Sequence, residues 1–274
     1  MLNQTFQHLH GIGKATDARL KAAGLCSWEA ALQAASLPLK TERCAAFRAE
    51  LAESCRRLEA GDALWFSEML PASEQWRLYP HFFPKAAYVD IETTGLAWPL
   101  AQITSIALYD GKTLRVYLQG RNLEDFVTDI AEYALLVTWN GRSFDAPFIR
   151  RFFRIPLQMA HLDLYPVFRS LGIKGGLKKV EKQLGLDRHE LDGVDGYMAI
   201  LLWNEYVESG DERAVETLLA YNAEDVFSLE TLCHHACEQK GVKLSHTCSK
   251  PVNPYKADVE LLTRLRRYIP EQRY

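Results

Sequence analysis

A chain of 274 residues with a formal net charge of −3 at pH 7 is long enough for one large domain, or for a small domain beside a medium one. The weak negative charge argues against a protein that simply coats nucleic acid, although it leaves room for a basic surface beside an acidic site. Six cysteines are too few for a disulfide framework in a chain of this size, so we expect reduced thiols and a cytoplasmic protein.

The first 62 residues have an Ala-rich helical pattern, in "HGIGKATDARLKAAGLCSWEAALQAA" and then "TERCAAFRAELAESCRRLEAGDA". The N-terminus has no apolar segment of signal-peptide length, and no later segment approaches the length of a membrane span, so we expect no membrane anchor. Residues 63–85 are aromatic and contain prolines without a clear period. They predict an irregular connection that packs on the next domain.

Residues 86–245 alternate between strand and helix patterns. Strands are predicted at residues 86–92, 102–110, 113–119, 134–140 and 159–165, with "DGK" as a tight turn after the second. Helices are predicted at residues 122–133, from Asp145 onward, and over most of the chain from the last strand to Gly241. Three strands in hairpin order followed by alternation predict a mixed sheet with helices on its faces. Residues 246–274 are predicted to be a C-terminal tail.

The first of these strands contains two acidic residues. In "AYVDIETTGL", Asp90 and Glu92 point to the same face, because successive strand side chains alternate, and this places their carboxylates about 7 Å apart. Carboxylates in an otherwise buried strand normally become neutral, form ion pairs or bind a cation. The pattern therefore predicts a compensating positive charge.

Two later segments carry further acidic candidates. In "LVTWNGRSFDAPFI", Asp145 follows a strand and precedes a helix, and on this segment alone it is typical of an N-cap. In "LLAYNAEDVFSLETL", Tyr221 and Asp225 share a helix face, since they are four residues apart. A single pair of this kind is typical of a surface hydrogen bond.

The order of these groups resembles that of a known family. A strand Asp-x-Glu, then Asn140 and Asp145, then Tyr-x-x-x-Asp on a late helix is the motif order of the ribonuclease-H-like DEDD 3′–5′ exonucleases. The stretches "DIETTGL", "WNGRSFD" and "YNAED" are similar to its motifs, and the resemblance spans residues 86 to about 240. The segment "HLDL" at 161–164 is similar to one in bacterial relatives of the YprB type. The chain resembles the tyrosine branch, because the histidine branch has His where Ala220 stands.

The resemblance implies an α/β fold with a ribonuclease-H-like mixed five-stranded sheet flanked by helices, preceded by a small all-α domain. It also implies two Mg²⁺ or Mn²⁺ ions about 4 Å apart, one activating water and one stabilising the leaving 3′ oxygen. Tyr221 matches the general base, but a phenol has a pKa near 10, so we expect it to orient the water and to accept its proton with help. We expect Asp163 to cap a helix and not to bind metal. The implied metal ligands are Asp90, Glu92, Asp145 and Asp225.

Substrate contacts are expected beside the motifs. In the family, residues just past the first motif hold the terminal nucleotide, and here these are Thr93, Thr94, Gly95 and Leu96. We assign Asn140 and Phe144 to substrate contact as well, with Phe144 stacking on a base, whereas Trp139 is more typical of a core residue. Basic side chains that could reach phosphates, although such runs are usually solvated, are Arg142, Lys174, Lys178 and Lys179.

The N-terminal segment "LHGIGKATDARLKAAGL" is similar to a helix-hairpin-helix motif, in which a Gly-hydrophobic-Gly turn joins two short helices. Gly11 and Gly13 permit a tight turn whose backbone N–H groups can bind a DNA phosphate, with Lys14 adjacent. The alternatives are a helical hairpin without a ligand, or one that binds protein. We favour DNA because a nuclease-like domain follows.

The segment "CHHACEQKGVKLSHTC" suggests a zinc site, but its spacing fits no standard pattern and Cys233 lies on the apolar face of a helix. The sequence leaves zinc binding there open.

The sequence as a whole predicts a metal-dependent 3′–5′ exonuclease that acts on single-stranded or 3′-ended nucleic acid, with DNA favoured. The alternatives are a noncatalytic nucleic-acid-binding module with a nuclease-like fold and an RNA-directed exoribonuclease.

Overall fold

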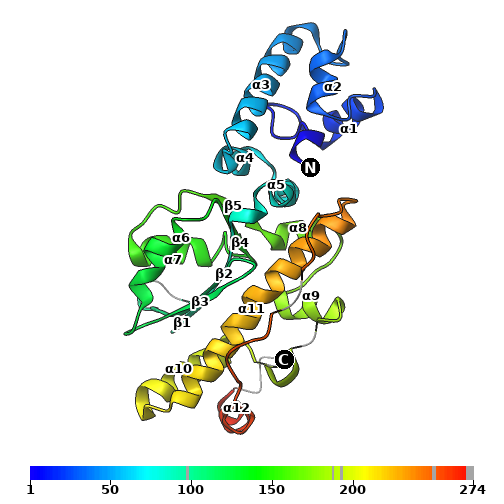
Figure 1. Ribbon diagram of the computed structural model, residues 1–274. Coiled ribbons are helices and arrows are strands. Elements are labelled where there is room, and N and C mark those ends of the chain that lie inside the picture. Colours follow the sequence, from blue (N-terminus) through cyan, green and yellow to red (C-terminus); the bar gives the residue numbers. More distant parts are fainter. Residues whose placement is uncertain (97–98, 187, 192–193, 249–250, 270–274) are drawn as a thin grey trace.

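A computed structural model describes residues 1–96, 99–186, 188–191, 194–248 and 251–269. It has a helical N-terminal region followed by a sheet with helices on both faces (Figure 1). Within these ranges, no helix combines the length and the apolar composition needed to cross a bilayer.

The N-terminal region consists of η1 (Leu2–Gln4), α1 (Lys14–Ala22), α2 (Trp28–Gln33) and α3 (Thr41–Glu59). The predicted helical character is confirmed, since residues 1–62 contain no strand. Of the two short helices predicted around the Gly-Ile-Gly turn, the second is present as α1. The first is absent, because only turns and the short 3₁₀ helix η1 precede the Gly-Ile-Gly turn. The buried Asp17 carboxylate holds this part together, because it accepts from the backbone N–H of Phe6 at 2.7 Å and pairs with Lys21.

Residues 63–85 form short helices and not the irregular connection that the sequence predicts. They are α4 (Ala63–Met69), η2 (Ala72–Leu78), α5 (Tyr79–Phe82) and η3 (Phe83–Lys85). Each element has at most seven residues, which is too short to display a helical period in the sequence. The segment does pack on the sheet as predicted: the Ser67 hydroxyl accepts from the backbone N–H of His161, 2.9 Å away.

The sheet has five strands, β1 (Ala86–Thr93), β2 (Ile103–Tyr109), β3 (Leu114–Leu118), β4 (Leu135–Thr138) and β5 (Ala160–Asp163). Their spatial order is β3-β2-β1-β4-β5. Strand β2 is antiparallel to both of its neighbours, β1 and β3, whereas β4 and β5 run parallel to β1. The mixed five-stranded sheet is therefore confirmed. The predicted turn after β2 is tight because Asp110 accepts from the amides of Lys112 and Thr113, while Gly111 has φ +87°.

Because successive side chains of β1 point to opposite faces, the two faces of the sheet pack against different layers of helices. Ala87, Val89 and Ile91 face η4 (Leu123–Asp125), α6 (Phe126–Ile130) and α7 (Asp145–Phe153). Tyr88 faces the other layer, which contains α8 (Leu164–Ser170) and the 28-residue α11 (Glu212–Gln239). The remaining helices of the layer are α9 (Leu177–Gln183), η5 (His189–Leu191) and α10 (Gly196–Ser209). In Figure 1, α11 runs along one side of the sheet for much of the length of the domain.

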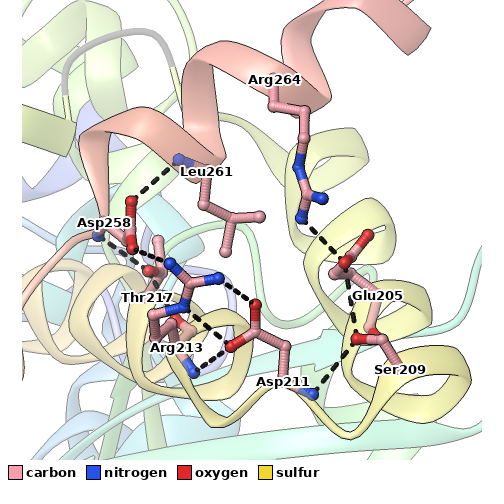
Figure 2. Close-up of polar contacts among 8 residues, drawn as sticks. All are labelled: Glu205, Ser209, Asp211, Arg213, Thr217, Asp258, Leu261 and Arg264. Atoms are coloured by element: carbon pink, nitrogen blue, oxygen red, sulfur yellow. Dashed lines mark hydrogen bonds and ion pairs between the residues drawn. The ribbon is translucent and has the colours of Figure 1, made fainter.

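The segment predicted as a tail contains a docked helix, α12 (Val259–Leu265), followed by η6 (Arg266–Tyr268). Figure 2 shows its attachment: Asp258 caps α12 by accepting from the N–H of Leu261 at 2.8 Å, and its own N–H donates to Thr217 of α11. Arg264 pairs with Glu205 of α10 at 2.8 Å. These contacts hold α12 against the corner between α10 and α11.

Candidate active site

A cleft of about 690 Å³ opens where α11 crosses the sheet beside β1. Its lining comes from five parts of the chain: β1, the loop from β4 into α7, the start of α8, the glycines that bracket α9 and η5, and α11. The lining residues include Asp90, Glu92, Asn140, Phe144, Asp145, Tyr221 and Asp225. The structure thus brings all the predicted acids and the predicted tyrosine to one cleft.

Three of the acids form a tight cluster. One carboxylate oxygen from each of Asp90, Glu92 and Asp225 lies within 4.8 Å of the others. Strand alternation supplies the first two and the crossing of α11 supplies the third. Asp145 lines the same cleft from the first residue of α7, and its Oδ1 accepts from the N–H of Ile91 at 3.3 Å. The bond fixes Asp145 to the backbone between the two acids of β1.

Burial makes this arrangement unfavourable for ionised carboxylates. It raises the pKa of Asp90 well above its usual range, with the neighbouring Asp225 as the next cause. Burial followed by Asp225 likewise raises the pKa of Glu92, and burial raises that of Asp145 to about 7. The sequence-based expectation that the acids need compensating positive charge therefore has a clear physical basis.

Two cations of the chain lie beside the cluster. Arg188 forms an ion pair with Asp225 and a bidentate pair with Glu181, at 2.6 Å for both bonds. Lys178 of α9 lies with its Nζ 4.2 Å from the centre of the Tyr221 ring and donates to the backbone carbonyl of Val194. The sequence left Lys178 as either a phosphate contact or a solvated lysine, and the structure places it half-buried beside the Tyr221 ring. No sequence pattern indicates Arg188, since its partner Asp225 is 37 residues away along the chain.

Tyr221 is only 4% exposed and shares its helix face with Asp225, as predicted. Burial raises the pKa of its hydroxyl well above the usual value, and Asp225, Glu92 and Asp90 add to the effect. The hydroxyl is therefore protonated at neutral pH. In this form it can donate a hydrogen bond, and it can accept a proton only after it has released its own.

Asn222 of α11 is a site residue that the sequence motifs do not identify. It is fully buried, and its amide nitrogen donates to Asp90 Oδ2 at 2.8 Å and to the Asp90 carbonyl at 3.2 Å. Its Oδ1 accepts from Ser105 of β2. The amide thus fixes the Asp90 carboxylate. A polar residue within an otherwise apolar helical stripe, three positions before Asp225, is the signal that could have identified it.

Asp163 shapes the loop after β4. It caps α8 by accepting from the N–H of Tyr165, and it also accepts from the N–H groups of Asn140 at 2.8 Å and Arg142 at 3.2 Å. Asn140 has φ +59°, a left-handed conformation that this capping stabilises. Asp163 is absent from the cleft lining, so the predicted capping role agrees with its position.

The predicted substrate contacts have different environments. Thr93 donates to the carbonyl of Gly95, and Thr94 accepts from the N–H of Gln102, so both shape the turn after β1. Leu96 is 83% exposed beyond that turn. Phe144 lines the cleft, and so does Trp139, which also packs on Phe168 of the core.

Other lining residues were not predicted, and one predicted contact lies elsewhere. Arg142 donates to the carbonyl of His161 at 2.7 Å, so its guanidinium holds β5 and does not line the cleft. Gly175, Gly176 and Tyr165 line the cleft without having been predicted. The pair of glycines before a Lys-rich helix was the available signal, because small residues allow close approach of a ligand to the backbone.

The Gly-Ile-Gly turn lies in the N-terminal region, away from the cleft lining (Figure 1). Gly11 has φ +68°, Ile12 is buried, and Gly13 is the N-cap of α1. Lys14 begins α1 and is exposed. The first N–H groups of a helix have no intrahelical acceptor, so this turn presents backbone donors beside a lysine.

The acid cluster fits a divalent cation by the chemistry of its donors. Carboxylate oxygens are the ligands that Mg²⁺ and Mn²⁺ prefer. Three of them converge within 4.8 Å, and Asn222 fixes one in place. A cation there would also offset the repulsion and the desolvation that raise the pKa values of these acids.

Parts of the chain are similar to a known family and to two polymerases. A family described as the RNase H superfamily matches residues 87–237. A curated protein named DNA polymerase 1, from Aeropyrum pernix, is 28% identical over 119 residues, which is 43% of this chain and 12% of that protein. The structure of a family B DNA polymerase from Pyrobaculum calidifontis aligns with a TM-score of 0.46 and 22% identity, over 55% of this chain and 24% of the polymerase. The chain therefore spans only a small part of either polymerase.

Proposed function

Because the chain belongs to the RNase H superfamily, we propose that it is a metal-dependent nuclease that removes nucleotides from a 3′ end by hydrolysis. The observation that carries the proposal is the convergence of Asp90, Glu92 and Asp225 in one cleft, with Asp145 and Tyr221 in its lining. A noncatalytic module would have no need for buried carboxylates whose repulsion the fold must offset.

Asp90, Glu92, Asp145 and Asp225 would hold two divalent ions, with Mg²⁺ or Mn²⁺ as the candidates. When bound, such ions acidify water and stabilise negative charge on the phosphate and on the leaving oxygen. The residues of the chain do the rest. Asn222 holds the Asp90 carboxylate in one orientation, and the bond from the N–H of Ile91 does the same for Asp145.

Tyr221 would orient the attacking water through a hydrogen bond of its hydroxyl, and it would take up the proton of that water only after passing its own phenolic proton to solvent. Support comes from its position between the acid cluster and Lys178, whose Nζ lies 4.2 Å from the ring centre. A nearby positive charge lowers the free-energy cost of forming a phenolate. Arg188 pairs with Asp225, and its bidentate pair with Glu181 would hold its guanidinium beside the cluster when metal is bound.

The proposed substrate is a single strand or a 3′-ended duplex. Phe144 and Trp139 line the cleft with aromatic faces on which a base can stack without regard to sequence. The similarity to a DNA polymerase favours DNA over RNA.

The two parts of the chain would have different roles. The helical region at 1–62 would hold nucleic acid through Gly11, Gly13 and Lys14, and the nuclease domain would be residues 86–245.

The test is digestion of 5′-end-labelled single-stranded DNA by the full chain with Mn²⁺, Mg²⁺ or EDTA. We expect a ladder that shortens from the 3′ end with either metal and no shortening with EDTA, because the donors are oxygen atoms. A matched substrate with a 3′-terminal phosphorothioate should be degraded more slowly. Degradation in EDTA, or intact DNA and RNA with both metals, would overturn the proposal.

A further inference from the structure

A second group of metal-ligating side chains lies toward the C-terminal end of α11. Glu230, His234 and His246 each offer one ligand atom, and these three atoms lie within 4.8 Å of one another. Glu230 and His234 are one helical turn apart on α11, whereas His246 comes from the segment that follows the helix and returns along it. None of these residues lines the acidic cleft.

The two histidines face each other through the same ring atom. The Nε2 atoms of His234 and His246 are 2.8 Å apart, and the ring centroids are 4.4 Å apart with the planes at 78°. Zn–N bonds of about 2.05 Å in a tetrahedral site place two ligand nitrogens about 3.3 Å apart. If the two Nε2 atoms moved apart by about half an ångström, both could therefore bind one ion between the rings.

A thiol completes the group. Cys248 hydrogen-bonds to the Glu230 carboxylate, and its Sγ lies 3.5 Å from the hydroxyl of Thr231. The returning segment thus places His246 beside His234 and Cys248 beside Glu230. The three ligand atoms of Glu230, His234 and His246 converge within 4.8 Å, and the Cys248 thiol lies next to this group, on the Glu230 side.

We propose that Glu230, His234, His246 and Cys248 form a structural binding site for a divalent transition metal, of which Zn²⁺ is the best match. Imidazole and thiolate ligands select zinc over magnesium or calcium, and four protein ligands are typical of a structural zinc site. The site is chemically distinct from the all-oxygen cluster in the cleft.

An entry path and a supporting shell are present. A cavity of about 700 Å³ is lined by His234, His246 and Cys248, and both histidines are half-buried, so an ion can reach the ligands from solvent. The ring of Phe83 stacks on His246 with centroids 3.9 Å apart, and Tyr79 packs against both histidines. These aromatic contacts restrict the orientation of the imidazoles.

Other cysteines and histidines of the same segment are excluded from the site by their positions. Cys233 and Cys237 are buried in the core, as the sequence predicted for Cys233. His235 points to another side of α11 and stacks on Phe168, with ring centroids 6.1 Å apart. His235 is therefore a suitable control, since it is a histidine next to a ligand but outside the cluster.

The consequence for the fold is a link between distant parts of the chain. The ion would join α11 to the returning segment at 241–248, and this segment packs on η3 through the stack of Phe83 on His246. A metal that binds only the folded state raises its stability. The site would thus stabilise the end of the domain to which the N-terminal helical region attaches.

The test is titration of the purified full chain, stripped of metal, with Co²⁺ as a spectroscopic probe and then with Zn²⁺. We expect one equivalent of Co²⁺ with the intense visible bands of a tetrahedral site and a thiolate charge-transfer band, both lost when Zn²⁺ displaces it. His246→Gln should weaken Co²⁺ binding by at least about 100-fold. Cys248→Ser should remove the charge-transfer band while the protein stays folded, as judged by circular dichroism.

Two controls separate this site from the acidic cleft. His235→Gln should keep the full Co²⁺ spectrum, and so should the double variant Asp90→Asn with Asp225→Asn, because neither change touches the proposed ligands. A wild-type Co²⁺ spectrum that lacks tetrahedral bands, or tetrahedral bands that depend on Asp90 and Asp225 and not on His246, would overturn the proposal.

Discussion

Helix α11 carries two groups of ligating side chains that differ in chemistry. Asp225 belongs to an all-carboxylate cluster in the cleft, whereas Glu230 and His234 belong to a group that also contains imidazole and thiol. Five residues separate Asp225 from Glu230, which at about 100° per residue rotates the side chain by roughly 140°. The two groups therefore face different sides of the same helix, one toward β1 and the other toward the returning segment.

The difference shows how one helix can serve chemistry and stability separately. The cleft cluster consists of like charges, and burial raises the pKa values of Asp90 and Glu92, so the fold holds it at a cost in free energy. The second group consists mainly of neutral ligands that pair with one another. Proteins accept such a cost where function needs it, and this supports assigning catalysis to the first group and a structural role to the second.

The largest expected effect comes from removing a carboxylate of the cleft. Asp225→Asn keeps the size of the side chain but removes a charge needed to hold metal, so we expect cleavage of single-stranded DNA to fall by about 1,000-fold or more. The Co²⁺ spectrum of the proposed zinc site should be unchanged in the same variant. Steady-state cleavage assays and the Co²⁺ titration measure the two quantities.

Glu216→Gln is the matched control, because Glu216 is an exposed acid on the same helix. It should leave both measurements at the wild-type level. If Asp225→Asn loses both DNA cleavage and the Co²⁺ spectrum, the acidic cleft and the proposed zinc site are not independent.

The sequence predicted the parts of this arrangement that depend on local pattern. Period-2 alternation identified β1 and the shared face of Asp90 and Glu92, and helical spacing paired Tyr221 with Asp225. What it could not predict rests on contacts between residues far apart in the chain. Asn222 meets Asp90 across 132 positions. His234 meets His246 only because the chain reverses after α11, which the spacing of the ligands does not reveal.

An intermediate effect is expected for the tyrosine of the cleft. Tyr221→Phe keeps the buried ring and removes only the hydroxyl, so metal binding should persist while kcat falls by about 10- to 100-fold. The variant separates the positioning of water from the binding of metal within one group of side chains. Mn²⁺ binding by calorimetry and kcat at saturating DNA give the two values.

Tyr206→Phe on α10 serves as the control, since its hydroxyl accepts from Arg121 on the outside of the domain. It should have wild-type kcat. Full activity of Tyr221→Phe across the pH range would remove Tyr221 from the proposed mechanism, and loss of Mn²⁺ binding would instead make it part of the metal site.

The smallest effect on the protein is expected at the N-terminal Gly-Ile-Gly turn, a third region, which is proposed to hold nucleic acid. Removal of residues 1–61 is an unsuitable test, because it would expose Phe66, which stacks on Trp28. Lys14→Ala is milder, since Lys14 is exposed at the start of α1. A lysine that contacts one phosphate contributes about one unit to the slope of log affinity against log salt, so we expect weaker binding of long DNA and a slope reduced by about one. Fluorescence anisotropy across a salt series measures both, with Lys40→Ala, an exposed lysine outside the turn, as the control. An unchanged affinity and an unchanged slope for Lys14→Ala would contradict a phosphate contact by Lys14, because a lysine that neutralises a phosphate releases counterions from the DNA, and would favour a structural or protein-binding role for the turn.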